Sequence, residues 1–218
     1  KKKMLALKWK DEVKTTVFRG VTLNTTRNGT VSIVGEFDEV TIEQFNLAVE
    51  DLTAQGAQSF IFDLRDNGGG LVKSVCDILD TILPKGLLVY TEDKNGKREE
   101  EWADDPDCIN VPMVVLVNGN SASASEIFTG AMKDYDKAEI IGTKTYGKGI
   151  VQSVIDLRDG TALKRTTAKY YTPDGNNIQE IGITPDVEFD LPEELKTEVT
   201  LSMEEDVQLQ KAIEVLQQ

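Results

Sequence analysis

The chain has 218 residues, 39% of them hydrophobic and 28% charged, and it contains no run of eighteen apolar residues. This composition is typical of a packed globular protein without a transmembrane helix. The formal net charge of −14 argues against a nucleic-acid partner, because phosphate binding needs clustered lysine and arginine. The chain has no histidine, which excludes Ser–His–Asp and Cys–His triads and the common histidine-containing zinc sites.

Neither the cysteines nor the basic first ten residues carry a recognisable signal. Cys76 and Cys108 are too few and too far apart for a CxxC metal or redox motif. We expect both to be ordinary small apolar side chains. The sequence alone does not decide whether they form a disulfide with each other. No apolar segment of a signal peptide follows residues 1–10, and the chain starts with Lys1, which suggests a processed protein or a fragment.

In the first half of the chain, short apolar runs typical of strands alternate with segments whose apolar residues recur at helical spacing. The pattern predicts, in chain order, a strand over 30–35, a helix over 42–56, a strand over 59–65, a glycine-rich turn over 66–70, a helix over 71–83 and a hairpin over 87–102. Asn95 and Gly96 are typical of the turn of such a hairpin. On the first helix, an apolar face is expected to contain Ile42, Phe45, Val49 and Leu52.

The second half continues the alternation. It predicts a strand over 112–118 that is covered on both faces, a strand-to-helix turn with a helix over 121–135, a strand over 138–143, a hairpin over 149–172 that turns at Asp159–Gly160, and a terminal helix over 204–218. Strands alternate with helices through most of the chain. The predicted class is therefore α/β, or mixed α+β, with a mixed sheet flanked by helices.

Three serines lie at the predicted turn into the helix, namely Ser121, Ser123 and Ser125. A serine at such a turn is exposed at the end of a sheet, near a helix N-terminus whose free N–H groups can bind an oxyanion. The same residues could be ordinary N-caps, with Glu126 completing a capping box with Ser123. This segment alone favours the capping interpretation.

Lys148 lies between two glycines in the segment TYGKG. Without histidine, a lysine is the natural general base for a serine, provided that burial favours its neutral form. A solvated loop lysine is the alternative, and it is the more common case. If the chain is extended after Lys148, Gln152 points to the same side and could orient the amine.

The turn Asp66–Gly70 contains three consecutive glycines, which let backbone N–H groups approach a ligand closely. It contains neither GxxxxGK nor GxGxxG, so it is not a Walker or Rossmann loop. A plain turn and an oxyanion-binding loop are about equally compatible with it.

Together these segments make the sequence resemble the C-terminal processing peptidases, also called tail-specific proteases. The resemblance runs from about Gly29 to the end of the chain. It is carried by FIFDLRDNGGGL, VVLVNGNSASASEIFTGAMKD, GTKTYGKGIVQSV, YYTPDGNNIQEIGITPDV and EEDVQLQKAIEVL. The SASASE and TYGKG blocks at this separation are specific to that family, which implies a crotonase-like, tail-specific protease core.

The resemblance also implies roles for individual residues. The family's lysine lies 25 residues after its serine, which selects Ser123 as nucleophile and Lys148 as general base. Gln152 matches a residue that assists the lysine in some members, and Glu126 matches an acid beside the serine with a supporting role. The oxyanion donors would be the N–H groups of Ala124 and Gly69, with Gly68 and Gly70 as alternatives. No metal or cofactor is implied.

The resemblance further implies a serine endopeptidase that cleaves protein or peptide substrates near their C-termini. It also implies a location outside the cytoplasmic membrane. Whether the protein forms an oligomer or binds a regulatory partner is an open question at this point. Residues 1–28 are too short for the PDZ domain that usually precedes the core, and they could be its remnant or a linker. The expected division is residues 1–28, a peptidase core over 29–190 and a C-terminal helical tail over 191–218 packed on the core. Two alternatives stay open: a non-catalytic binding module on the same fold, and a protease that is latent until a partner or PDZ domain aligns it.

Overall fold

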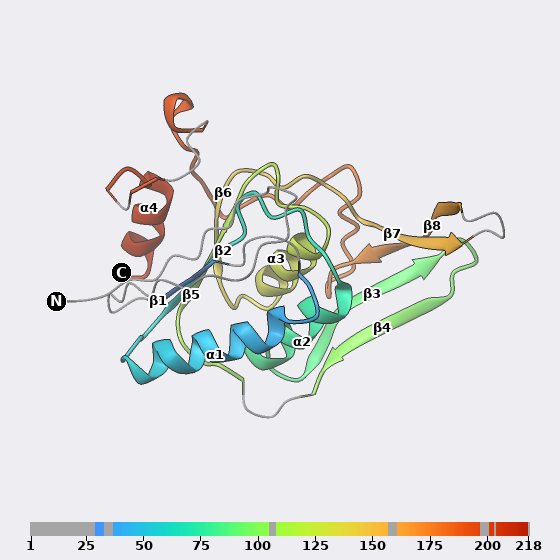
Figure 1. Ribbon diagram of the computed structural model, residues 1–218, viewed down its shortest axis with the longest axis horizontal. Coiled ribbons are helices and arrows are strands. Elements are labelled where there is room, and N and C mark those ends of the chain that lie inside the picture. Colours follow the sequence, from blue (N-terminus) through green and yellow to red (C-terminus); the bar gives the residue numbers. More distant parts are fainter. Residues whose placement is uncertain are drawn as a thin grey trace.

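The computed structural model describes residues 29–32, 37–104, 108–156, 161–196, 201–202 and 204–217. Within these residues it forms two β-sheets, with α-helices packed against them (Figure 1). The proposed PDZ remnant in residues 1–28 and the hairpin turn at Asp159–Gly160 lie outside the described residues. The division of the chain at residues 28 and 190 stays a prediction.

The first sheet is parallel, and its strands run in the order β1-β2-β5-β6-β9. These strands are β1 (Gly29–Ser32), β2 (Phe60–Asp63), β5 (Met113–Val117), β6 (Glu139–Gly142) and β9 (Val187–Glu188). Every residue of β2 and β5 is buried, as expected for apolar runs that are covered on both faces. Because β2 and β5 are parallel neighbours, the turns that follow them leave the sheet at the same edge.

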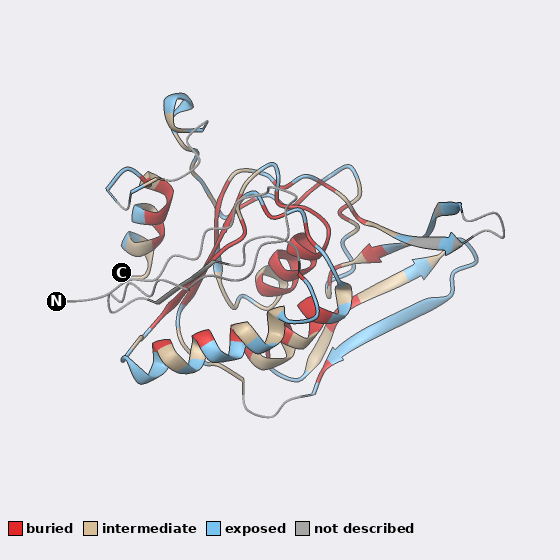
Figure 2. Ribbon diagram, in the orientation of Figure 1, coloured by how far each residue is buried: buried red, intermediate tan, exposed pale blue. Residues whose placement is uncertain are grey.

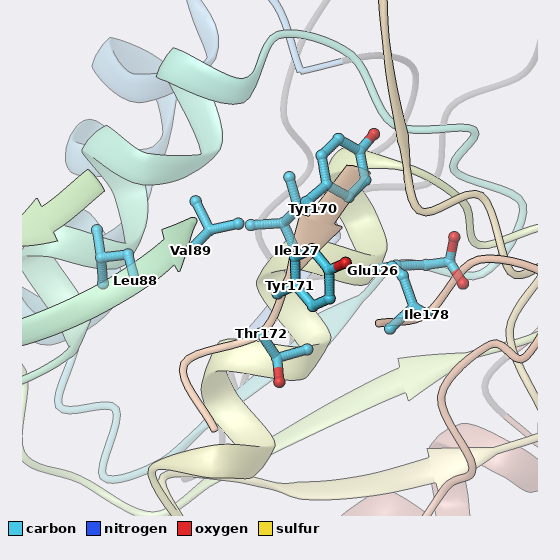
Figure 3. Close-up of a pocket in the computed structure, with 8 residues that line it drawn as sticks. All are labelled: Leu88, Val89, Glu126, Ile127, Tyr170, Tyr171, Thr172 and Ile178. Atoms are coloured by element: carbon cyan, nitrogen blue, oxygen red, sulfur yellow. The ribbon is translucent and has the colours of Figure 1, made fainter. Parts of the chain in front are cut away.

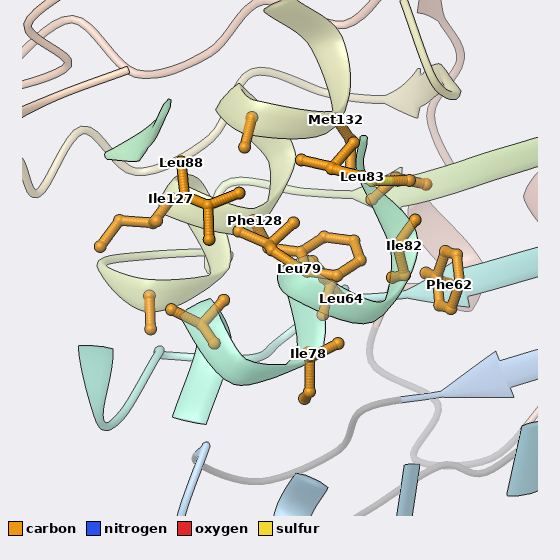
Figure 4. Close-up of a cluster of buried hydrophobic side chains, with 14 of the residues drawn as sticks. Phe62, Leu64, Ile78, Leu79, Ile82, Leu83, Leu88, Ile127, Phe128 and Met132 are labelled. Atoms are coloured by element: carbon orange, nitrogen blue, oxygen red, sulfur yellow. The ribbon is translucent and has the colours of Figure 1, made fainter. Parts of the chain in front are cut away.

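Helices cover both faces of this sheet. One face packs against α1 (Thr41–Ala54), α2 (Val72–Ile82) and α3 (Ala124–Asp134), and the other packs against α4 (Val207–Val215). Alternation along β2 sends Phe60 and Phe62 into the first core and Ile61 into the second. Figure 4 shows the larger core, where the rings of Phe62 and Phe128 meet edge to face at 5.4 Å.

The second sheet is antiparallel and has the order β4-β3-β8-β7. Its strands are β3 (Gly86–Asp93), β4 (Arg98–Ala103), β7 (Ile150–Asp156) and β8 (Ala162–Tyr171). In Figure 2 its outer part is mostly exposed, whereas α3, at the centre of the molecule, is buried along most of its length. The inner end of β8 therefore lies against the core, beside α3.

The fold class and the main predicted elements are confirmed. The first helix buries Phe45 and Leu52 as predicted, while Ile42 and Val49 are only half-buried. Two short elements were not predicted: β9 and a 3-10 helix, η1 (Glu193–Leu195).

Two further findings concern the cysteines and the helices. Cys76, which is buried, and Cys108, which is half-buried, are both free thiols, so the disulfide left open above does not form. Within the described ranges, no helix combines the length and the apolarity needed to cross a bilayer.

Candidate active site

The turn from β5 into α3 holds Ser123 in an unusual backbone conformation. Its φ is 58° and its ψ is −116°, and α3 begins at the next residue. A non-glycine residue in this region is strained and persists only where its surroundings hold it. Such a strained serine at a strand-to-helix turn has the geometry of a nucleophile elbow.

The flanking serines supply the restraint. Ser121 Oγ donates a hydrogen bond to the Leu64 carbonyl (2.7 Å), and Ser125 Oγ donates to the Asn67 carbonyl (3.0 Å). The Ala122 N–H also donates to the Asn67 carbonyl (3.0 Å). Ser121 and Ser125 are therefore structural, and their hydroxyls tie the elbow to the turn that follows β2.

The hydroxyl of Ser123 has a different neighbour. Its Oγ lies 3.0 Å from the hydroxyl oxygen of Tyr170, at the end of β8. The backbone N–H of Ser123 donates to Glu126 Oε2 (3.0 Å), which is the carboxylate half of the capping box considered above. Capping and a contact with Tyr170 are thus compatible: the capping box with Glu126 is present, and Oγ still lies within hydrogen-bond distance of the Tyr170 hydroxyl.

Glu126 connects the elbow to the segment that contains Lys148. Its side chain is fully buried and accepts hydrogen bonds from the N–H groups of Ser123 (3.0 Å), Lys148 (2.8 Å) and Gly147 (2.7 Å) and from the hydroxyl of Thr145 (2.6 Å). A buried carboxylate needs such donors in place of water. One side chain therefore fixes the backbones of both predicted catalytic residues.

The Lys148 side chain is half-buried. The Gly149 N–H donates to Gln179 Oε1 (2.9 Å), which holds the other side of the loop. In the part of the chain that the structure describes, Lys148 Nζ makes no hydrogen bond or ion pair, and Ser123 Oγ is not bonded to it. The structure therefore brings the two segments together through Glu126, without a hydrogen bond between Ser123 Oγ and Lys148 Nζ in the part it describes.

The glycine turn packs directly on the elbow. A Cβ on Gly69, whose φ is 108°, would lie 2.6 Å from the Ala122 carbonyl oxygen and 2.7 Å from Ser123 Cβ. A larger residue therefore cannot occupy position 69. The Gly69 carbonyl accepts a hydrogen bond from the Phe37 N–H (2.7 Å), which anchors the turn from outside.

The N–H groups of the two predicted oxyanion donors differ in whether they already have a hydrogen-bond partner. The Ala124 N–H has no hydrogen-bond partner among the described residues, as an oxyanion donor requires before substrate binds. The Gly69 N–H instead donates to Asn67 Oδ1 (2.9 Å). This amide has to leave Asn67 before it can bind an oxyanion.

Gln152 lies in β7 and is exposed. Within the described structure it has no hydrogen bond to Lys148, so its assisting role stays a prediction. Tyr170 was missed because it lies 47 residues from Ser123, with no local motif to mark it. Asn67 was missed as well, although its place at the head of the glycine turn was a usable signal.

A small apolar pocket adjoins the site. Figure 3 shows its lining by eight residues: Leu88, Val89, Glu126, Ile127, Tyr170, Tyr171, Thr172 and Ile178. Its volume of about 10 Å³ is that of a single water at most, so it is a packing space, too small for a substrate side chain. Among the described residues, no cluster of acidic and cysteine side chains could hold a metal ion.

Comparison with known proteins assigns the chain to a family. Residues 29–189 match the model of peptidase family S41. The chain is 41% identical over 169 residues to a carboxyl-terminal-processing protease from Synechocystis, covering 78% of this chain and 39% of the relative. It is 40% identical over 164 residues to a chloroplastic C-terminal processing peptidase from Tetradesmus obliquus, covering 75% and 35%.

A solved photosystem II D1 C-terminal processing protease is 38% identical and superposes with a TM-score of 0.69, covering 75% of this chain and 43% of that one. The chain thus spans about two-fifths of the length of these proteins. The matched region contains the strained serine, the glycine turn and the lysine loop. The chain belongs to peptidase family S41, the family of the C-terminal processing proteases.

Proposed function

We propose that this chain forms the catalytic core of a serine endopeptidase that cleaves proteins near their C-termini, with Ser123 as nucleophile and Lys148 as general base. The observation that carries this proposal is the buried Glu126, which holds the strained serine elbow and the lysine loop on one carboxylate. An ordinary helix cap needs neither the strain at Ser123 nor a contact with a lysine 25 residues away.

The reaction follows from these positions. Neutral Lys148 Nζ takes the proton from Ser123 Oγ, and Oγ attacks the scissile carbonyl. The N–H groups of Ala124 and Gly69 bind the resulting oxyanion, the latter after its release from Asn67. Lys148 returns the proton to the leaving amine, and water then hydrolyses the acyl-enzyme.

Substrates, partners and location are part of the same proposal. The relatives are named for processing at carboxyl termini, which supports protein or peptide C-termini as substrates. We place the protein outside the cytoplasmic membrane on the basis of its family. Gln152 is assigned an assisting role toward Lys148.

Two features favour a latent form of this enzyme as the second candidate. The Gly69 N–H is bonded to Asn67, and Lys148 Nζ is without a hydrogen-bond partner in the described structure. Both have to change before turnover. A non-catalytic binding module is disfavoured, because binding alone gives no reason for a strained serine next to a lysine loop.

The test compares Ser123→Ala and Lys148→Ala with the unaltered chain on an unfolded protein substrate with a free C-terminus and on a small ester. Lys144→Ala is the matched control, because Lys144 is an exposed lysine at the other end of the same loop. We expect both activities to vanish in the first two variants and to persist in the control. Near-normal turnover by a folded Lys148→Ala variant would refute the lysine base.

The ester separates the latent form from the active one. Ester hydrolysis without any added partner argues against latency, because a small ester needs only an aligned dyad and oxyanion site. A folded chain that hydrolyses neither substrate, but gains activity when the longer natural protein or a partner is supplied, supports latency.

A further inference from the structure

Tyr170 is placed against the reacting atom of the proposed mechanism. Its side chain is 3% exposed, and its hydroxyl oxygen lies 3.0 Å from Ser123 Oγ. It is the contact of the Ser123 hydroxyl with another side chain, besides the capping box that Ser123 forms with Glu126. The nucleophile is therefore oriented by a phenol before any contact with Lys148.

The tyrosine is held firmly. Its N–H donates to the Gly149 carbonyl (3.0 Å), and its own carbonyl accepts from Asn177 Nδ2 (2.9 Å). The ring lines the small apolar pocket together with Ile127 and Ile178 (Figure 3). Because Gly149 directly follows Lys148, the tyrosine is fixed by the same loop that carries the proposed base.

The protonation of the phenol decides what it can do. Burial raises the pKa of Tyr170, the hydrogen bond with Ser123 lowers it by less, and the Glu126 carboxylate raises it further. The phenol therefore keeps its proton across the neutral range. In that form it can donate a hydrogen bond to Ser123 Oγ and cannot act as the base.

A serine hydroxyl has one hydrogen and two lone pairs. If Tyr170 donates to one lone pair, the hydrogen remains free for Lys148, and the second lone pair serves the carbonyl carbon once the capping contact with the Glu126 N–H is released. The three partners then use all three positions without competition. The opposite direction, with Ser123 donating to the phenol oxygen, would keep the proton from Lys148 and would make Tyr170 a brake.

We propose that Tyr170 is a third catalytic residue, which donates a hydrogen bond to Ser123 Oγ, sets its rotamer and stabilises the negative charge that develops on it. The proposal rests on the proposed Ser123–Lys148 function. In acylation the Ser123 proton passes to Lys148 and from there to the leaving amine; in deacylation a water proton passes to Lys148 and from there to Ser123 Oγ. Tyr170 retains its own proton throughout. When the acyl-enzyme breaks down, the same donor stabilises Oγ as it leaves the carbonyl carbon.

The test is Tyr170→Phe, with Tyr171→Phe as the matched control. Tyr171 is the next residue, and its ring stacks on Tyr90 at 4.8 Å. We expect kcat to fall on the order of 10²-fold in Tyr170→Phe with KM little changed, as for loss of one preorganised donor. The rate of Ser123 labelling by a fluorophosphonate probe should fall in parallel, and the control should behave as the unaltered chain.

A second variant protects the test against a folding defect. Difluorotyrosine at position 170 keeps the ring and hydroxyl but lowers the phenol's pKa. We expect near-normal turnover at neutral pH and a loss of rate that begins at lower alkaline pH than in the unaltered enzyme. A purely structural role for Tyr170 would leave the pH profile unmoved.

The outcomes distinguish the two proposals. Unchanged kcat and labelling in Tyr170→Phe, with Ser123-dependent activity in the unaltered chain, would overturn the role of Tyr170 alone. Increased rates would also overturn it, because they would identify Tyr170 as a brake. If neither turnover nor Ser123 labelling is seen, even in the longer natural protein or with a partner supplied, the proposed function fails and the role of Tyr170 falls with it.

Discussion

The backbone of Ser123 lies where a non-glycine residue carries about 1–3 kcal/mol of strain. This strain is offset by local bonds: the hydroxyls of Ser121 and Ser125 hold either side of the elbow, and Glu126 accepts its N–H. In this conformation Ser123 is the N-cap of α3, and its Oγ also lies within hydrogen-bond distance of the Tyr170 hydroxyl.

This strain predicts a difference between two inactive variants. Ser123→Ala and Ser123→Gly both lose the hydroxyl and its bond with Tyr170, but only glycine relaxes a φ of 58°. We expect the glycine variant to have the larger free energy of unfolding, by about 1 kcal/mol. Urea denaturation of the two proteins measures this difference.

The comparison has a clear control. Ser74, in α2, has ordinary helical neighbours, and there glycine should be less stable than alanine by roughly 0.5–1 kcal/mol. A glycine variant at 123 that is also less stable than alanine would show that the elbow is not strained.

At the scale of single residues, local motifs are enough to predict that certain residues lie together, but not which side chains of other elements contact them. Ser123, Ala124 and Gly69 lie together as expected because each follows a strand of the same parallel sheet. Tyr170 could not be found in this way, since its position depends on how a second sheet packs against α3. The same holds for the hydrogen bond between Gly69 and Asn67, which depends on a side-chain rotamer.

At the scale of elements, α4 is joined to the parallel sheet by a buried ion cluster. Arg65, just after β2, makes two hydrogen bonds with Asp63 (2.6 and 2.8 Å) and two with Asp206 (2.8 and 2.9 Å). Burial alone would lower the pKa of Arg65, but the two carboxylates outweigh it and raise the pKa. Asp206 also caps α4 by accepting the Leu209 N–H at 3.0 Å.

Replacing Asp206 with alanine removes one carboxylate and the cap together. Because it leaves the guanidinium of Arg65 buried with only Asp63 as an anion, we expect a loss of about 3–5 kcal/mol in the free energy of unfolding. Lys211→Ala is the control on the same helix, since its pair with Glu214 is more exposed and should contribute at most about 1 kcal/mol. Chemical denaturation gives both values.

Hydrogen exchange shows which element loses stability in the Asp206→Ala variant. In Asp206→Ala the amides of α4 should exchange faster than those of β5, because the helix loses its cap and its main polar tie to the sheet. Equal stability of the Asp206 and Lys211 variants would show that the ion cluster contributes little.

Local patterns account for most elements but not for how the strands assemble. The periodicity of α1 and α2 and the buried run of β5 were readable, since each reflects one element facing one core. The pairing of β3 with β8, in which Tyr90 lies opposite Tyr171, joins segments about 80 residues apart and leaves no local signal. The two-residue strand β9 is too short for any periodicity.

At the scale of the whole molecule, the site lies where the two sheets meet. The serine elbow and the glycine turn follow strands of the parallel sheet, whereas Lys148 and Tyr170 belong to β7 and β8 or the loop before them. One hydrophobic core includes residues from both sheets, among them Phe62 and Leu88. The relative placement of Ser123 and Lys148 therefore depends on how the two sheets pack and on Glu126, which accepts the backbone N–H groups of both residues.

The stability of this shared core should depend on alkaline pH through Cys76. Its side chain packs in the core from α2, and burial raises the pKa of its thiol from 9.0 to about 12. Below pH 9 the thiol is protonated in both states; between pH 9 and 12 the unfolded chain loses this proton while the folded chain keeps it. The unfolded state then binds fewer protons, so the free energy of unfolding falls as the pH rises, by up to about 1.4 kcal/mol per pH unit.

Cys76→Ala isolates this contribution. The variant should be less stable at neutral pH because it leaves a small cavity, but its stability should fall less steeply between pH 9 and 12. Cys108→Ala is the control, since that thiol is only half-buried. Urea denaturation at a series of pH values, with reductant present, measures the slopes. Parallel curves for the Cys76 variant and the unaltered chain would mean that the Cys76 thiol ionises equally readily in the folded and unfolded states, and that the core around α2 admits water.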